Sequence, residues 1–320
     1  MDKPFKSIDE QLQLLKDRGL YFNNDEEAKD YLLRNNYYNV VNCYGHFLKV
    51  PGKDEFITGA AFSEMIAIHQ FDGHFKSALF KSLLDVENSF KSVLAYEFSK
   101  EYLNEINPYL NQANYNQNRL PKVINLLSDL NKILSKYMHI NISNNSIKHY
   151  VNRHKHVPLW VLCNYMTFGQ AVTMYDLINT NIQNEIAKNF SISLNKNFNL
   201  TKKKFLHPND IYLLFGNFKD VRNQLAHDNM IFNYKTRTSC PYFAEVYSKY
   251  SLNPSLTRQN IFDVVIDERL FFNEGAHYTL CNSLAKSMRR LEKELKTVSI
   301  DTITGSLGFP KDFRKLCIKQ

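Results

Sequence analysis

The chain has 320 residues, of which 44% are hydrophobic, and a formal net charge of +8 at pH 7. This composition is too apolar for an intrinsically disordered chain. With only 10 glycines and 9 prolines, it favours long helices over a strand-and-turn architecture. The positive charge agrees with a polyanionic partner but does not establish one.

The sequence shows no sign of export, membrane insertion or metal binding. Its N-terminal residues are polar, and no apolar run reaches the length needed to span a membrane. The five cysteines are far apart and lack the paired spacing of a metal site. We therefore expect a cytoplasmic protein with no membrane partner, no metal and no cofactor.

The first 50 residues are predicted to form short helices. Ile8, Leu12 and Leu15 recur at helical spacing. Such helices could imitate a helix-turn-helix, but no basic recognition face stands out, so packing is the favoured role. We accordingly divide the chain into an N-terminal helical extension, residues 1–50, and a larger helical domain, residues 51–320.

A long helical pattern follows this extension. Apolar residues from Phe62 to Phe98 recur mostly at three- and four-residue steps, which predicts one long helix or two nearly collinear ones. Further helices are predicted over residues 120–138 and 158–177. Residues 179–204 are polar and rich in lysine, so we expect a connector there.

The C-terminal third contains both irregular and helical segments. Residues 236–260 are predicted to be irregular, and 261–266 could form a short strand or begin a helix. A last long helix over 274–297 carries a heptad seam, which favours packing inside a bundle, with dimerisation as the alternative. The predicted fold class is all-α, a bundle of long antiparallel helices.

The segment most informative about function is the helix expected to begin at Pro208. Lys219, Asn223 and His227 follow one another at four-residue spacing and therefore share one side of this helix. Arg222 borders that side, about 140° around the axis from His227. This angle is awkward for direct contact, but a long arginine side chain could still reach a phosphate shared with the imidazole.

An arginine and a histidine beside one phosphodiester suffice for metal-free RNA cleavage. The imidazole of His227 can take the proton from the 2′-hydroxyl or give one to the departing 5′-oxygen. The guanidinium of Arg222 can hold the phosphate and offset its growing charge. Asn223 could orient the imidazole or the substrate. The alternative is that these are cap and surface residues at a helix end, since the motif is short enough to occur by chance.

Basic residues elsewhere are predicted to contact RNA. One group is a basic patch before Pro158, where metal ligation is not expected. A second is a lysine run, which is a solvated surface on its first interpretation and an RNA-backbone contact on its second. A third candidate lies on the motif helix. The basic patch contains Arg153 and His156, and the lysine run is Lys202, Lys203 and Lys204. The candidate on the motif helix is Lys219.

Two acidic residues, Asp72 and Glu87, lie within the apolar pattern of the long helix. They could form a catalytic carboxylate pair. Burial of each beside a lysine or an arginine is the favoured interpretation, because an unpaired carboxylate is costly in an apolar interior.

The motif also resembles a known family. Arg222-Asn223-x-x-Ala226-His227, followed by Ile231-Phe232-Asn233, is similar to the signature of Abi-like (AbiD/AbiF-type) abortive-infection proteins. That signature is a version of the Arg–polar–spacer–His motif of the HEPN ribonuclease superfamily. Other segments resemble the same family in the same order. They are Asn36-Tyr37-Tyr38, Phe71-Asp72, Pro158-Leu159-Trp160 and Leu307-Gly308-Phe309-Pro310.

The sequence departs from the family pattern at several neighbouring positions. Basic residues commonly follow the Phe-Asp pair, where Gly73 and His74 stand here, and Asn164 replaces a common acidic residue after the Trp. Asp228 and Met230 stand where His and Arg are frequent. These differences bear on substrate contacts and leave the Arg–His pair intact.

The resemblance implies a HEPN-type bundle and a metal-independent endoribonuclease, a toxin of antiphage defence with RNA as its substrate. For AbiF-type members it also implies a small non-coding RNA that restrains the protein. The related motif occurs twice in type VI CRISPR effectors, whereas no second Arg–four–His spacing exists here. A composite site would therefore need two chains, and we expect a symmetric homodimer. The alternatives are a non-catalytic RNA-binding protein of the same fold and a DNA-binding regulator using residues 8–47.

Overall fold

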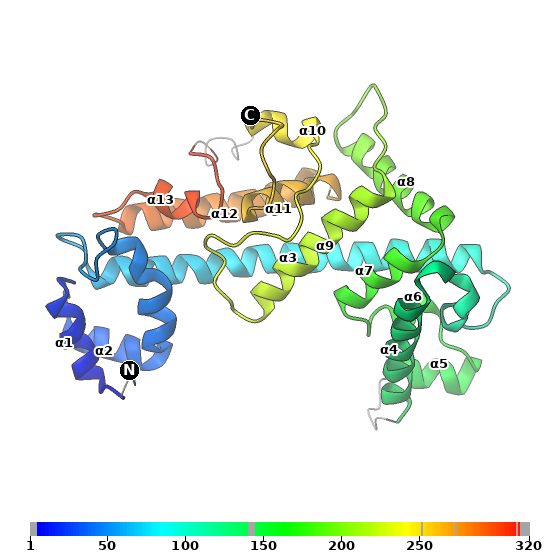
Figure 1. Ribbon diagram of the computed structural model, residues 1–320, viewed down its shortest axis with the longest axis horizontal. Helices are drawn as coiled ribbons and strands as arrows, with labels where there is room; N and C mark the ends of the chain where they lie inside the picture. The colour runs from blue at the N-terminus through cyan, green and yellow to red at the C-terminus, as the bar shows by residue number, and fades with distance from the viewer. Residues whose placement is uncertain (1–4, 140–144, 251, 273, 312, 314–320) are drawn as a thin grey trace.

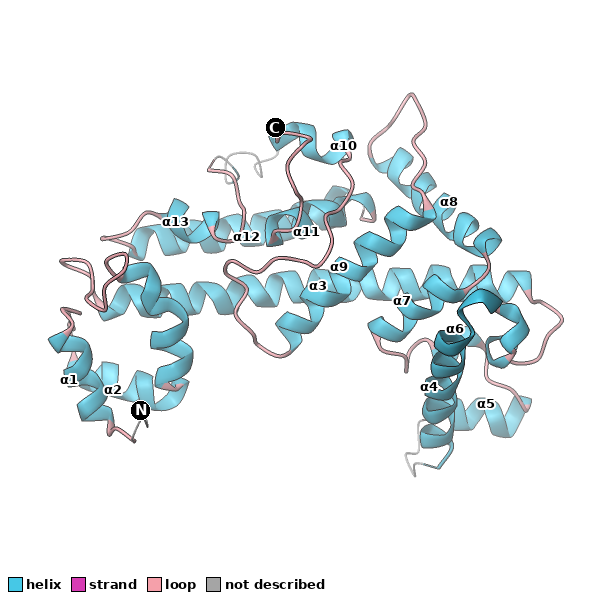
Figure 2. Cartoon of the chain, in the orientation of Figure 1, coloured by secondary structure: helices cyan, strands magenta, loops and turns pink. Residues whose placement is uncertain are grey.

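The computed structural model describes residues 5–139, 145–250, 252–272, 274–311 and 313. Within these ranges the regular structure is helical, and β-pairing is confined to isolated bridges (Figure 2). The all-α prediction is confirmed. The α-helices are α1 (Ile8–Asp17), α2 (Asp25–Asn35), α3 (Phe62–Glu101), α4 (Leu120–His139), α5 (Ser146–His154), α6 (Leu159–Leu162), α7 (Phe168–Leu177), α8 (Thr180–Asn197), α9 (Pro208–Ala226), α10 (Ala244–Tyr247), α11 (Ile261–Asp267), α12 (Glu274–Glu294) and α13 (Ile300–Gly305).

The long helix α3 forms the spine of the molecule. It is continuous over 40 residues, which corresponds to a length of about 60 Å, and Figure 1 shows the other helices arranged along it. The sequence had left open one helix or two nearly collinear ones. A single helix forms because no proline interrupts the pattern and apolar residues from Phe62 to Phe98 stay buried along its length.

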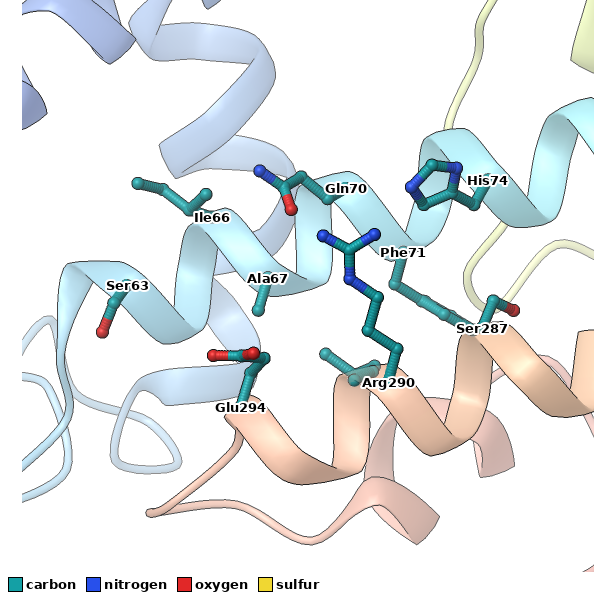
Figure 3. Close-up of a pocket in the computed structure, with 10 residues that line it drawn as sticks. Ser63, Ile66, Ala67, Gln70, Phe71, His74, Ser287, Arg290 and Glu294 are labelled. Carbon is teal, nitrogen blue, oxygen red and sulfur yellow. The ribbon is translucent and has the colours of Figure 1, made fainter.

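Helix α12 packs antiparallel along the first half of α3. The backbone N–H of Thr297, just beyond α12, donates to Glu64 Oε1 at 2.8 Å, whereas Ser82, farther along α3, hydrogen-bonds Glu268, which precedes α12. Leu284, Met288 and other seam residues are buried. The predicted packing of this seam inside the bundle is therefore confirmed. The two helices flank a hollow of about 230 Å³. Figure 3 shows Arg290 of α12 directed across this hollow toward α3.

Helix α9 also runs antiparallel to α3 and brings the motif to its middle. Close to the middle of α9, the rings of Phe215 and Phe90 stack with centroids 4.1 Å apart. Just past its end, Asp228 Oδ1 lies 3.1 Å from Lys76 Nζ. Aromatic side chains from α7, α8 and the segment before α12 complete the packing around Phe215, and such buried rings account for much of the stabilisation of a core.

Two predictions about element boundaries were wrong. Residues 179–204 are mostly helical, because Ile182, Ile186, Phe190 and Leu194 form a buried stripe amid the surrounding asparagines and lysines. The single helix expected over 158–177 is broken into α6 and α7. The undecided segment 261–266 is helical and forms most of α11.

The N-terminal helices pack onto the start of α3. An isolated bridge joins Tyr21 to Ala61, another joins Lys49 to Phe56, and Leu15 and Leu32 belong to the same buried cluster as Phe62. The hydrophobic core thus continues across residue 50, and the domain division at that residue stays a prediction.

Candidate functional site

The motif lies at the C-terminal end of α9, which stops there for a local reason. The helix begins with Pro208 in its first turn, where the missing N–H costs nothing. At the other end, the N–H of His227 still bonds the carbonyl of Asn223 at 3.2 Å, but Asp228 adopts a left-handed conformation with φ of 51°. This conformation ends the helix, and His227 is exposed there.

Arg222 is held against α3. Its Nε lies 3.2 Å from Glu87 Oε2, its guanidinium lies 5.7 Å from the centroid of the Phe80 ring, and 27% of its side chain is exposed. The Nη1 atom donates a long hydrogen bond of 3.4 Å to Asn223 Oδ1. The guanidinium is therefore partly buried and partly neutralised, yet it still reaches solvent.

Glu87 lies between two cations. Its Oε1 accepts from Lys91 Nζ at 2.6 Å, and the same ammonium donates to the carbonyl of Met166 at 2.6 Å. The Glu87 side chain is only 6% exposed. The favoured interpretation of Glu87 as a buried ion-pair partner is confirmed, and this pair fixes the position from which Arg222 projects.

A second buried pair supports the residue after His227. Lys76 Nζ lies 2.5 Å from Asp72 Oδ2 and 3.1 Å from Asp228 Oδ1, and it also donates to the Asp228 carbonyl at 3.3 Å. Tyr44 donates to Asp72 Oδ2 at 2.8 Å. Burial raises the pKa of Asp72, while the Lys76 ammonium opposes that rise. The ion pairing expected for Asp72 is confirmed.

The sequence alone had given no role to Lys76, Lys91 or Tyr44. A signal was present for the two lysines, because each stands four residues after an acidic residue on a largely apolar helix, and such a pair shares one helix face. Tyr44 gave no such signal, because it lies outside α3 and reaches Asp72 only through the tertiary fold.

The structure places Arg222 and His227 at the same end of α9. Asn223 connects them, since its side chain contacts Arg222 and its carbonyl accepts from the N–H of His227. In the described part of the chain, no hydrogen bond joins the guanidinium to the imidazole. One chain therefore carries both groups at the C-terminal end of α9, with the guanidinium turned toward α3.

Lys219 lies two helical turns before His227, about 12 Å along the axis. Its Nζ pairs with Asp220 Oδ1 at 3.0 Å, and its side chain lines a shallow hollow of about 500 Å³ together with Lys122, Thr167 and Gly169. The residue is thus on the motif helix, with its ammonium paired to Asp220.

The other predicted RNA-binding residues lie elsewhere. His156 lines a pocket with Lys100, which is 13 positions beyond Glu87 on α3 and hence about 20 Å along the helix from it. Lys202 and Lys203 are exposed in the loop before α9, a helix length of about 28 Å from His227.

Arg153 is exposed on α5, and Lys204 pairs with Glu245 of α10 at 3.0 Å. The structure does not gather these basic residues around the Arg–His pair, so their role in RNA binding stays a prediction.

No cluster of three or more His, Cys, Asp or Glu side chains suited to a metal ion occurs among the described residues. Within the same residues, none of the helices combines the length and the apolar character required to cross a bilayer.

Comparison with known proteins identifies the family. Neither the curated proteins nor the solved structures gave a match to this chain. The family model described as Abi-like protein matches residues 30–233, a span that begins in α2, contains all of α3 and ends just after the Arg222–His227 motif. Since this match covers well over half of the sequence, the chain belongs to the Abi-like protein family.

Proposed function

We propose that this protein is an RNA-cleaving toxin of abortive phage infection, a metal-independent endoribonuclease of the HEPN type. The observation that supports the proposal most is that an exposed histidine, His227, and a partly exposed guanidinium, Arg222, occur at the same end of one helix. Family membership supports the link to phage defence.

The chemistry is an attack of the ribose 2′-oxygen on the adjacent phosphorus. The bond to the 5′-oxygen breaks, which leaves a 2′,3′-cyclic phosphate and a 5′-hydroxyl. One proton must leave the 2′-hydroxyl and another must reach the departing oxygen. Arg222 would bind the phosphate through its terminal nitrogens, because Glu87 already occupies the Nε edge. Asn223 would orient the guanidinium and the imidazole relative to each other.

A homodimer would supply the second acid/base group that the reaction needs. One imidazole transfers one proton at a time, so a second His227, from another copy of the chain, would serve as the complementary acid or base. In mixtures of wild-type and His227→Ala chains, activity would then fall as the square of the wild-type fraction. A linear fall would show that each chain works alone.

The decisive experiment is cleavage of RNA by purified, RNA-free protein in EDTA. The wild-type protein should cut and leave 5′-hydroxyl ends. His227→Ala should lower the rate by roughly 10²- to 10⁴-fold, and Arg222→Ala should abolish both cleavage and toxicity. His74→Ala, which removes another exposed histidine, is the matched control and should remain active. A requirement for Mg²⁺, or full toxicity in both motif variants, would show the nuclease mechanism to be wrong.

The second candidate is a non-catalytic RNA-binding protein of the same fold. The contact that favours it is the Arg222–Glu87 ion pair, because a guanidinium already paired with a carboxylate is a weaker phosphate ligand. A protein that retains bound RNA through purification, yet shows the same negligible cleavage as His227→Ala, would support this candidate. A small non-coding RNA that restrains the protein is part of the proposal in either case, and sequencing the RNA recovered with the native protein would identify it.

A further inference from the structure

One lobe of the molecule is free of acidic residues over a long stretch. The sequence contains no Asp or Glu between Asp129 and Asp176, and this stretch supplies the second half of α4, all of α5 and α6, and most of α7. Figure 1 shows α4, α5 and α6 grouped toward one end of α3. The basic side chains of the stretch are Lys132, Lys136, His139, Lys148, His149, Arg153, His154, Lys155 and His156. A stretch with charges of one sign attracts a polyanion.

The cations of α5 are available to a ligand. In the described part of the chain, no carboxylate lies within ion-pair distance of Lys148 or Arg153, and Arg153 is exposed. Rings are interleaved with these charges. The centroids of Tyr150 and His154 lie 5.1 Å apart, and those of His154 and His156 lie 6.4 Å apart. Interleaved cations and rings are typical of surfaces that bind single-stranded nucleic acids.

This surface leads into a pocket of about 400 Å³ between the end of α3 and residues 156–160, a volume within the roughly 300 to 1,000 Å³ of small-molecule sites. Two aromatic side chains that line it are largely exposed, namely Trp160 at 56% and Tyr96 at 65%. Leu103, Pro108 and Leu159 add an apolar lining, and an indole that stays exposed beside such a lining is available to stack on a flat ligand.

The walls of the pocket are held in place by polar contacts. Asn107 Oδ1 accepts from the N–H of Val157 at 3.0 Å, which fixes the segment carrying His156. The carboxylate of Glu105 accepts from the side-chain amides of Asn111 and Asn114, at 3.1 and 2.8 Å. Lys100 pairs with Glu97 at 3.2 Å. The α3 side of the pocket is thus mixed in charge, and the excess of positive charge comes from α5.

We propose that this pocket and the adjoining surface of α5 form a binding site for single-stranded RNA, in which one nucleobase stacks on Trp160 and the neighbouring phosphates contact Arg153 and Lys155. The choice of RNA rests on the proposed function. The site begins at Tyr96, about 14 Å along α3 from the Arg222–Glu87 pair, so it holds RNA without taking part in cleavage. An unpaired base is required, because a base within a duplex cannot enter a pocket.

Trp160 is the single tryptophan of the chain, so intrinsic fluorescence reports on this site alone. The full-length His227→Ala protein should be titrated with a single-stranded 2′-O-methyl oligouridylate, which cannot be cleaved. Saturable quenching of the tryptophan emission is the expected result. A duplex of the same length should quench far less. Equal quenching by the duplex, or no quenching at saturation, would overturn the proposal.

Affinity measured with a labelled oligonucleotide provides the second readout. Trp160→Ala should weaken binding by roughly 5- to 150-fold, as for loss of one base–aromatic stack, and Trp160→Phe should retain most of the affinity. Arg153→Gln should weaken binding and reduce its dependence on salt. Tyr38→Ala is the matched control, since Tyr38 is 64% exposed and lies in the N-terminal region. Unchanged affinity in Trp160→Ala would exclude the stacking site.

The catalytic assignment of His227 and the stacking site at Trp160 can be overturned independently. Cleavage that survives His227→Ala would remove the catalytic assignment without affecting the fluorescence result. Conversely, normal RNA affinity in Trp160→Ala would remove the stacking site without affecting catalysis. A negatively charged lipid surface is another polyanion that could bind here, and vesicles containing phosphatidylserine test it. A change of emission with vesicles but not with RNA would show the site to be lipid-binding and the RNA proposal to be wrong.

Discussion

Arg222 Nε lies 3.2 Å from the buried carboxylate of Glu87, across the interface between α9 and α3. This contact makes Arg222 both a candidate phosphate ligand and a structural residue. A loss of activity in an Arg222 variant therefore needs a measurement that separates chemistry from folding. A variant of Glu87 provides that measurement, because Glu87 holds the guanidinium but would not touch RNA.

Replacing Glu87 with Gln should destabilise the fold. The substitution leaves Lys91, whose side chain is 11% exposed, without its carboxylate, and breaking a buried pair costs roughly 3 to 5 kcal/mol. Chemical denaturation of Glu87→Gln and of wild-type protein measures the difference. Lys188→Gln breaks an exposed pair with Glu185 and should change stability by less than about 1 kcal/mol. Equal stability of Glu87→Gln and wild type would contradict the structural role.

Asp228 should tolerate asparagine better than alanine. Its φ of 51° is accessible to asparagine, whereas alanine loses about 1 to 2 kcal/mol in this conformation. The side chain is 87% exposed, so loss of the pair with Lys76 alone should cost well under about 1 kcal/mol. Thermal unfolding of the two variants tests this order. If the asparagine and alanine variants lose the same stability, the ion pair with Lys76, and not the left-handed backbone, determines the stability of this helix end.

The stability of the protein should fall as the pH rises from about 4 to about 8. Burial raises the pKa of Asp267 to about 8, so the folded protein retains a proton that the unfolded chain has released. Stability from this group is complete below the unfolded pKa of about 3.9 and is lost as the pH rises through about 8, by up to roughly 1.4 kcal/mol per pH unit. Tyr247 donates to Asp267 Oδ1 at 2.8 Å, a bond that asparagine can still accept.

Urea denaturation across this pH range checks the prediction. Asp267→Asn should show a shallower decline than wild type. Burial also raises the pKa of Glu268, and its contribution is present in both proteins and cancels in the comparison. Parallel declines in the two proteins would mean that Asp267 is ionised at neutral pH, against the prediction.

Gly308 is expected to be irreplaceable for a steric reason. Its φ is +85°, and an added Cβ would lie 2.4 Å from the Cβ of Asn260, the residue before α11. Gly308→Ala should lose roughly 1 to 3 kcal/mol. Gly73→Ala, within α3 and with no atom within 4 Å of the new Cβ, should instead gain about 0.5 to 1 kcal/mol. Melting temperatures that move in the same direction would contradict this contrast.

The amino-acid sequence by itself determined the fold class, the helical pattern over residues 62–98 and the seam of α12, because apolar residues at three- and four-residue steps require a helix with one buried face. It also located the Arg222–His227 motif and the ion pairing of Asp72 and Glu87, since an acidic residue in an apolar helix needs a nearby cation. It missed α8, whose buried stripe is diluted by asparagine and lysine.

The tertiary structure alone decided which distant residues meet. Glu87 and Arg222, or Lys76 and Asp228, are far apart in the sequence and come together only because α9 runs antiparallel to α3. It also separated the Trp160 pocket from the motif, placing the two at different positions along one long helix. Periodicity within a segment specifies which face is buried, but it carries no information about the partner that covers that face.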